Sequence, residues 1–327
     1  MTVRSAATSD EGSLSRVTDT PGLPTTSHKH APRLRPSQRR SRLDYVRPDT
    51  GRATRARGRL QTVPVVSVLS LKGGVGKTTV TLGLAGSALV RGLRTVVVDL
   101  DPQGNATTAL DPQLVRFTAN DALVDGRTPH FDDSLASSAW GSGLRVLASE
   151  PALERRNHPD GGGEHLLRSA LAGADDADLI LVDCPPSLAA LTTNALAASD
   201  LALVVTEPTM FALTGAQAAL SAVDSVRSAH NLRLRPAGVV VNRYRTRSAE
   251  HRFRLDELIA AYRDLVLDPV LPDRSAITQA QGSCLPIQRW PSPGAREVAR
   301  IFTGYLDHLL AVARTSSDGP FGKGGPR

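Results

Sequence analysis

Short apolar segments alternate with amphipathic segments along this chain from residue 64 onward. The apolar segments are rich in Val, Leu and Ile, which is typical of strands that are buried on both faces of a sheet. The amphipathic segments repeat their apolar residues at helical spacing, most clearly over residues 294–313. This alternation predicts an α/β fold in which a mostly parallel, twisted sheet carries helices on both faces.

The pattern also predicts where each element lies. The predicted strands are 64–70, 95–100, 144–148, 178–183, 201–206 and 237–242, with a short strand near 265–270. The predicted helices are 77–91, 119–125, 164–172, 188–198, 213–230, 250–263 and 294–313. We expect residues 63–314 to form one domain. The segments 1–62 and 315–327 are rich in Ser, Thr, Pro, Gly or Arg, and we expect them to be disordered tails.

The first predicted strand leads into a glycine-rich loop and then into a helix. Residues 71–79 are Leu-Lys-Gly-Gly-Val-Gly-Lys-Thr-Thr. Such glycines let backbone N–H groups turn inward around an anion, and the positive end of the following helix adds to the attraction. The loop departs from the usual phosphate-loop template at its first position, where Leu71 replaces glycine, and it carries an extra lysine, Lys72. The segment therefore predicts a nucleotide site of the P-loop NTPase class.

The residue types in this loop suit phosphate chemistry. Lys77 is expected to reach the β- and γ-phosphates, and the Thr78 hydroxyl is expected to bind Mg²⁺. The chain has four lysines and 35 arginines, and two of the lysines, Lys72 and Lys77, lie here, where a guanidinium cannot replace a compact ammonium without cost. The predicted phosphate-binding residues are Gly73, Gly74, Val75, Gly76, Lys77, Thr78 and Thr79.

Polar side chains stand where three later strands end. Asp99 and Asp101 close the second strand, and Asp183 and Asn242 end two further strands. Ligands of open α/β sheets bind outside the carboxyl ends of the strands. We therefore expect Asp183 to hold Mg²⁺ through water, and a carboxylate of the second strand to orient or deprotonate the attacking water. Taken singly, each of these residues could instead be a helix cap or a turn former.

Three segments together resemble the ParA/Soj/MinD family of partition ATPases, whose phosphate loop is of the deviant Walker A, SIMIBI-like type. They are K-G-G-V-G-K-T from Lys72, V-D-L-D-P-Q-G-N over 98–105, and D-C-P-P-S over 183–187. The resemblance covers about residues 64–312. It implies ATP and Mg²⁺ as cofactors, slow and partner-stimulated hydrolysis of ATP to ADP and phosphate, and a homodimer that forms when ATP binds.

The resemblance also assigns roles to single residues. Lys72 matches the family's signature lysine, which reaches the phosphates of the partner in a nucleotide-sandwich dimer. Asp101 matches the acid that positions the attacking water, and Asp99 and Asn105 match neighbours in the metal and switch-loop network. The implied catalytic residues are Lys72, Lys77 and Asp101. The implied metal site consists of Thr78, Asp183 and Asp99.

Two later segments resemble parts of the family that lie near the base. Asn242 matches a position whose side-chain amide often reads adenine, although the pair Asn-Arg is more typical of MinD than of ParA. A turn-forming role for Asn242 remains open. Residues 272–286 resemble the C-terminal segment near the base, but Gln279 stands where an acid is common.

Charge is distributed unevenly along the chain. The formal net charge is +7, and residues 1–60 hold 13 Lys and Arg against 5 Asp and Glu, a balance of +8 that leaves the remainder near −1. A basic arm of this kind binds polyanions such as DNA in a salt-dependent manner, or it is a solvated tail without a partner. In ParA-like proteins surface arginines also bind DNA without sequence preference, which points here to Arg227, Arg245 and Arg247; a solvated charged face is the alternative.

Several classes are excluded by what the sequence lacks. No apolar run approaches the length of a membrane span, and the two cysteines form neither a disulfide framework nor a metal knuckle. The Gly- and Pro-rich end cannot form the basic amphipathic helix of MinD-type membrane oscillators. The paired cysteines of iron–sulfur relatives and the terminal tyrosines of autokinases are also missing. We expect a cytoplasmic, nucleoid-associated protein that does not bind membranes.

Three functions remain open at this point. The first is an ATP-dependent dimerisation switch that binds DNA non-specifically, responds to a ParB-like stimulating protein and acts in chromosome or plasmid partitioning. The second is a related ATPase that positions a non-DNA cargo or a polar protein complex. The third, which lacks a further catalytic constellation in the sequence, is an enzyme that uses ATP to activate a small carboxylate.

Overall fold

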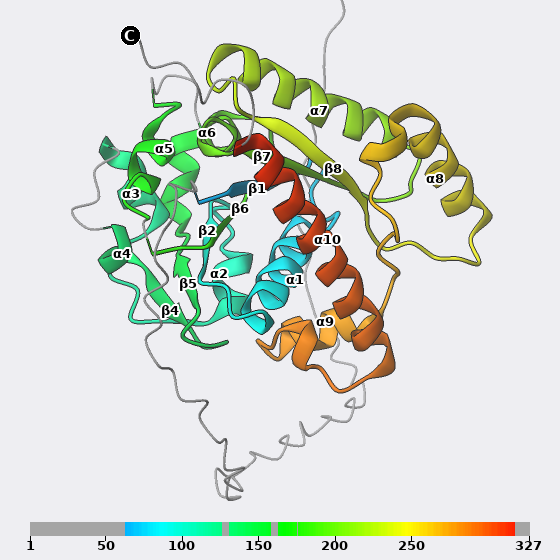
Figure 1. The fold of residues 1–327 in the computed structure, drawn as a ribbon, viewed down its shortest axis with the longest axis horizontal. Coiled ribbons are helices and arrows are strands. Elements are labelled where there is room, and N and C mark those ends of the chain that lie inside the picture. The colour runs from blue at the N-terminus through cyan, green and yellow to red at the C-terminus, as the bar shows by residue number, and fades with distance from the viewer. Residues whose placement is uncertain (1–62, 126–130, 158–162, 175, 318–327) are drawn as a thin grey trace, which may run out of the picture. The chain divides into compact units, whose positions relative to one another are not determined.

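The computed structural model describes residues 63–125, 131–157, 163–174 and 176–317, and the predicted tail 1–62 lies outside them (Figure 1). The strands are β1 (Val65–Leu69), β2 (Thr95–Asp99), β3 (Pro112–Gln113), β4 (Ala136–Ser138), β5 (Leu144–Leu147), β6 (Leu179–Asp183), β7 (Leu201–Thr206) and β8 (Arg235–Val241). The α-helices are α1 (Lys77–Val90), α2 (Asn105–Leu110), α3 (Ala119–Asp125), α4 (Phe131–Ser134), α5 (Leu166–Leu171), α6 (Ala190–Ala198), α7 (Ala212–Ala229), α8 (Ala249–Tyr262), α9 (Ser275–Gly282) and α10 (Pro293–Ser317). Short 3₁₀ turns are η1 (Pro151–Asn157), η3 (Arg263–Leu265) and η4 (Ile287–Arg289).

The strands form one eight-stranded sheet in the order β3-β4-β5-β2-β6-β1-β7-β8. In the sheet order β5-β2-β6-β1-β7-β8 every neighbouring pair is parallel. At the other edge β3 pairs antiparallel with β4, and β4 pairs antiparallel with β5. β1 lies between β6 and β7, so the phosphate loop that follows it starts near the middle of the sheet. The predicted mostly parallel α/β sheet is confirmed.

Helices cover both faces of the sheet, and successive strand residues alternate between two apolar cores (Figure 1). In β1, Val66 and Val68 pack into the core shared with α1, α2, α9 and α10, whereas Val65 and Leu69 pack into the core shared with α3, α5, α6, α7 and α8. All five residues of β1 are buried. A strand with apolar neighbours on both faces is continuously hydrophobic, which is why its sequence shows no alternation.

Helix α1 packs closely against α10 because Gly83 lacks a side chain. A Cβ atom on Gly83 would overlap the ring of Phe302, which is itself almost fully buried. The ring also packs edge-on against Tyr305, and the Tyr305 hydroxyl donates a 2.6 Å hydrogen bond to the Pro269 carbonyl. The Gly83–Phe302 contact thus joins α10 to α1, and the hydrogen bond of Tyr305 joins α10 to the segment before α9.

Two predicted boundaries were wrong. No strand is present over 265–270: Val266 makes an isolated bridge to Val239, and the ladder stops because Pro269 has no N–H to donate. Helix α10 continues to Ser317, three residues into the predicted C-terminal tail. Among the described residues, no helix is both long enough and apolar enough to cross a membrane.

The close α1–α10 packing gives a stability prediction. Gly83→Val should lower the free energy of unfolding by about 1–3 kcal/mol, because the added methyl groups would force the Phe302 ring out of its place. Urea denaturation measures the change. Gly304→Val on α10 is the matched control, since nothing lies within 4 Å of a Cβ there, and its effect should stay below about 0.5 kcal/mol. Equal effects of the two substitutions would contradict this account of the packing.

Candidate nucleotide-binding site

The predicted site residues converge at the carboxyl edge of the sheet. Asp183, the last residue of β6, lies in register with Val68 of β1 on one side and with Asp99 of β2 on the other. Neighbouring strands lie about 5 Å apart. The pairing of the strands therefore places Asp183 beside the start of the phosphate loop and Asp99 one strand further away.

Asn242 stabilises the phosphate loop through a hydrogen bond to its backbone. Its side-chain Nδ2 donates a 2.7 Å hydrogen bond to the Val75 carbonyl, and the residue is 2% exposed. Gly76 has a φ of 98°, and a Cβ atom there would collide with the Asn242 amide. Glycine is thus required at position 76 for its backbone conformation and for space. The Asn242 Oδ1 atom is buried without a hydrogen-bond partner, so an acceptor is left over for a ligand, and the adenine contact stays a prediction.

Thr78 and Asp183, which the sequence predicts to bind Mg²⁺, contact each other, and their binding of the ion stays a prediction. Thr78 Oγ1 donates a 2.7 Å hydrogen bond to Asp183 Oδ2, and Thr81 Oγ1 donates one of 3.1 Å to Asp183 Oδ1. Burial, together with the charge of Asp99, raises the pKa of Asp183 to about 8, although the hydrogen bonds from the two threonines and the charge of Lys77 act in the opposite direction. The ligand-free site therefore favours the protonated carboxyl.

Asp99 holds the loop that follows β2. Its Oδ2 accepts hydrogen bonds of 2.8 Å from both the backbone N–H and the hydroxyl of Thr107, and its Oδ1 accepts one from Asp101 N. Burial outweighs these hydrogen bonds and raises the pKa of Asp99 to about 6. Both carboxylate oxygens are engaged in holding the loop after β2, and direct binding of metal by Asp99 stays a prediction.

Asp101 lies two residues beyond Asp99 and is 6% exposed. Its Oδ1 accepts a hydrogen bond from Gln103 N at 3.0 Å, and its carbonyl accepts one from Ser149 Oγ at 2.5 Å. Ser149 N in turn donates to Thr107 Oγ1. Thr107 and Ser149 were not predicted from the sequence, because their roles depend on the end of β5 lying beside the end of β2.

The oxygen donors suit Mg²⁺. This ion prefers hard oxygen ligands, binds one or two carboxylates and completes its shell with water and phosphate oxygens. Thr78 and Asp183 supply a hydroxyl and a buried carboxylate in contact with each other. In the described part of the chain no group of three or more His, Cys, Asp or Glu could hold a metal ion.

The two loop lysines have different surroundings. Lys77 opens α1 and is 6% exposed, whereas the side chain of Lys72 is 54% exposed. The Lys72 ammonium lies 4.0 Å from Glu207 Oε2, and Glu207 Oε1 accepts a 2.5 Å hydrogen bond from Arg243 Nη1. Glu207 was missed in the sequence because it lies far from the loop along the chain and belongs to none of the recognised motifs.

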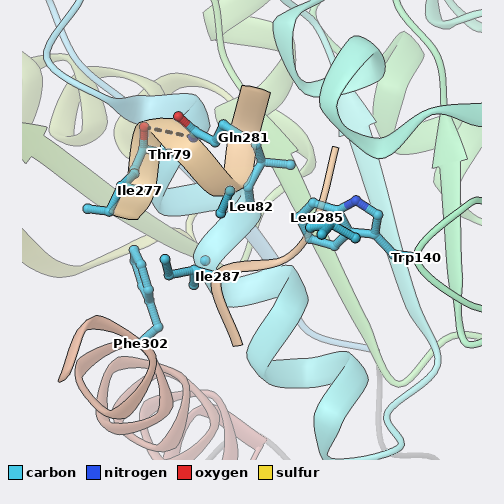
Figure 2. A pocket seen from close by; sticks show the side chains of 10 residues that line it. Thr79, Leu82, Trp140, Ile277, Gln281, Leu285, Ile287 and Phe302 are labelled. Atoms are coloured by element: carbon cyan, nitrogen blue, oxygen red, sulfur yellow. Dashed lines mark hydrogen bonds between the residues drawn. The ribbon is translucent and has the colours of Figure 1, made fainter. Parts of the chain in front are cut away.

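The segment predicted to lie near the base packs against α1. Figure 2 shows a small, mostly apolar pocket between α1, α9, α10 and Trp140. At its polar end, Gln281 Nε2 donates a 3.1 Å hydrogen bond to Thr79 Oγ1. Because Gln281 supplies the donor, the Thr79 hydroxyl keeps its own proton for another acceptor. Gln281 was also missed, since neither α9 nor this contact was predicted.

The three arginines predicted to bind DNA do not form one cluster. Arg245 and Arg247 are exposed in the loop between β8 and α8, and Arg245 Nε pairs with Asp273 at 2.7 Å. Arg227 lies in the last turn of α7, whose first residue, Ala212, follows β7 at the site edge. At 1.5 Å per residue, Arg227 lies about 22 Å along the helix from that edge. DNA binding by these residues stays a prediction.

Comparison with known proteins supports the class that this geometry defines, a P-loop nucleotide-binding protein. A family model described as an AAA domain matches residues 63–235. The chromosome-partitioning ATPase Soj of Thermus thermophilus is 33% identical over 238 residues, which cover 72% of this chain and 92% of that protein. The chromosome partitioning protein ParA of Caulobacter vibrioides is 31% identical over 231 residues, covering 68% and 85%.

A solved structure is also similar. The cobyrinic acid a,c-diamide synthase of Mycobacterium smegmatis, crystallised with an ATP analogue and magnesium, aligns with a TM-score of 0.63 and 28% identity over 78% of this chain and 97% of that one. The chain belongs to the ParA/Soj family of partition ATPases.

Because the Asp183 carboxyl is buried, we expect the stability of the fold to decrease as the pH rises. The pKa of Asp183 is raised in the folded chain, so the folded state keeps the proton to higher pH than the unfolded state and loses stability as pH rises from about 4 to about 8. Asp183→Asn cannot ionise. Without nucleotide or Mg²⁺, it should therefore raise the melting temperature by a few degrees at pH 8 and leave it almost unchanged near pH 4.

Asp307→Asn is the control for this measurement. A hydrogen bond from Arg91 lowers the pKa of Asp307, so its ionised form stabilises the fold above about pH 4 and this substitution should lower the melting temperature slightly at pH 8. Thermal melts between pH 4 and 9 compare the two. A lower melting temperature for Asp183→Asn at pH 8 would contradict the proposed cost of the buried charge.

Proposed function

We propose that this protein is a Mg²⁺-dependent ATPase that dimerises when it binds ATP, binds DNA without sequence preference in that state, and acts in chromosome or plasmid partitioning. A ParB-like protein stimulates hydrolysis and release. In this proposal the protein acts on the nucleoid in the cytoplasm. The support is membership of the ParA/Soj family together with the arrangement of the site.

One observation carries the proposal: the two loop lysines face different surroundings. Lys77 is buried at the start of α1, where it can serve only the phosphates held by its own loop. Lys72 is half-exposed on the outer rim of that loop, where its flexible stem can reach a second molecule. A loop that needed both ammonium groups for its own nucleotide would bury both.

The residues then divide the work of phosphoryl transfer. The backbone of Gly73–Thr79 and the Lys77 ammonium hold the phosphates, and Asp101 holds the attacking water in line. Thr78 and Asp183 hold Mg²⁺, whose charge stabilises the β- and γ-phosphates. Asn242 keeps the loop in shape through Val75 and offers its free Oδ1 to the amino group of adenine.

The cobyrinic acid a,c-diamide synthase likeness supports the third function, activation of a small carboxylate by ATP. Partitioning is favoured, because the Soj and ParA relatives are 31–33% identical and are covered over 85–92% of their length. Positioning of a non-DNA cargo has no comparable support. The two assays below separate these functions.

The first assay separates binding from hydrolysis. Lys77→Ala should abolish ATP binding, whereas Asp101→Ala should bind ATP with an affinity within about threefold of wild type but hydrolyse it at least about 100-fold more slowly. Asp101→Ala should also accumulate as an ATP-bound dimer. Equilibrium binding of a fluorescent ATP analogue, phosphate release and light scattering supply the three readouts. Wild-type turnover by Asp101→Ala would remove Asp101 from the catalytic role.

The second assay tests DNA binding at near-physiological salt with ATP, ADP or no nucleotide. It compares the full chain with a chain shortened to begin at Thr62, using duplexes of unrelated sequence. We expect ATP-dependent binding that survives removal of the basic arm and weakens steeply as salt increases. Lys77→Ala is the control without nucleotide. Binding that ignores nucleotide and disappears with residues 1–61 would favour positioning of another cargo, and absence of ATP-dependent DNA binding would contradict the proposal.

A further inference from the structure

Three charged side chains meet at the rim of the phosphate loop. Lys72 follows β1, Glu207 follows β7 and Arg243 follows β8, and these strands are neighbours in the sheet. The Glu207 carboxylate shares its two oxygens between the cations: Oε1 accepts from Arg243 Nη1 at 2.5 Å, and Oε2 lies 4.0 Å from Lys72 Nζ. Each cation therefore has its own oxygen atom.

The three residues differ in how firmly the fold holds them. The Glu207 side chain is 14% exposed, whereas the side chains of Lys72 and Arg243 are each 54% exposed. Arg243 has a φ of 56°, a conformation uncommon for a residue with a Cβ atom, and it directly follows Asn242, which is anchored to the loop. Lys72 and Arg243 are equally exposed, but the backbone at Arg243 is held beside Asn242 and its guanidinium is in close contact with Glu207, whereas the Lys72 ammonium lies 4.0 Å from the carboxylate and is the group that can leave.

We propose that Glu207 is a positioning residue that retains Lys72 on its own chain until a second copy docks, and that Arg243 keeps this restraint weak enough to release. The inference rests on the proposed function, in which Lys72 serves the phosphates of a second copy.

The physical reason lies in what happens to Glu207 when Lys72 departs. A mostly buried carboxylate that loses its only cation is strongly disfavoured. Arg243 remains paired with Glu207, so the charge stays compensated and Lys72 is free to move to another anion. Removing Glu207 and removing Arg243 should therefore act in opposite directions on Lys72.

The restraint can be measured in the nucleotide-free monomer. A brief pulse of acetic anhydride followed by peptide mass spectrometry reads Lys72 cleanly, because the chain has only four lysines. A Lys72 side chain held beside the Glu207 carboxylate is less free to meet the reagent than one that is released. Glu207→Gln should speed Lys72 acetylation about two- to fivefold, and Arg243→Gln should slow it by a similar factor. Both differences should shrink in 1 M salt.

Matched controls come from another surface ion pair. Arg274, in the segment before α9, pairs at 2.9 Å with Glu297 on α10, and the two side chains are 43% and 41% exposed. Glu297→Gln and Arg274→Gln change the net charge as the test variants do and should leave Lys72 labelling unchanged. Equal labelling of Lys72 in wild type, Glu207→Gln and Arg243→Gln overturns the inference whatever the oligomeric state.

The same variants then test the consequence for assembly. In sedimentation at saturating ATP, Glu207→Gln should dimerise at about two- to fivefold lower protein concentration than wild type, and Arg243→Gln at correspondingly higher concentration. Weaker dimerisation of Glu207→Gln overturns the inference, because Glu207 would then assist the dimer. A wild-type chain that stays monomeric with ATP overturns the proposed function itself, and the labelling result shows separately whether the restraint on Lys72 exists.

Discussion

The hydrogen bonds from Thr78 and Thr81 to Asp183 tie the first turn of α1 to the end of β6, and the rest of the site depends on them. They hold an ionisable group in the interior beside Asp99, where each charge disfavours the other. An arrangement selected for stability alone would not place two carboxylates in register on adjacent strands. The cost is understandable in a site that receives a cation, because bound positive charge removes the repulsion.

The loop after β2 is coupled to the same centre. Thr107 donates to Asp99 and accepts from Ser149, and Ser149 donates to the Asp101 carbonyl, so the acid expected to position water is connected to Asp99 through a partly buried network of hydrogen bonds.

Fold alone does not choose the function. A solved structure named as a cobyrinic acid a,c-diamide synthase is similar to this chain in fold, and proteins named for chromosome partitioning are similar to it in sequence. Function depends on the side chains of the site rather than on the fold. In this chain Lys72 and its partner Glu207 lie at the rim of the phosphate loop, whereas Lys77 and Asp183 are buried.

The amino-acid sequence was enough to predict the parallel strands of the sheet, the phosphate loop and the acids at the strand ends. These features are local: a continuously apolar segment is a buried strand, and a residue that ends a parallel strand must lie at the ligand edge. Only the tertiary structure decided that Asn242 holds Val75, that Gln281 reaches Thr79 and that Glu207 lies beside Lys72. It also separated Arg227 from Arg245. Such contacts depend on strand order, register and side-chain direction between distant segments, and neither spacing nor periodicity along one chain contains that information.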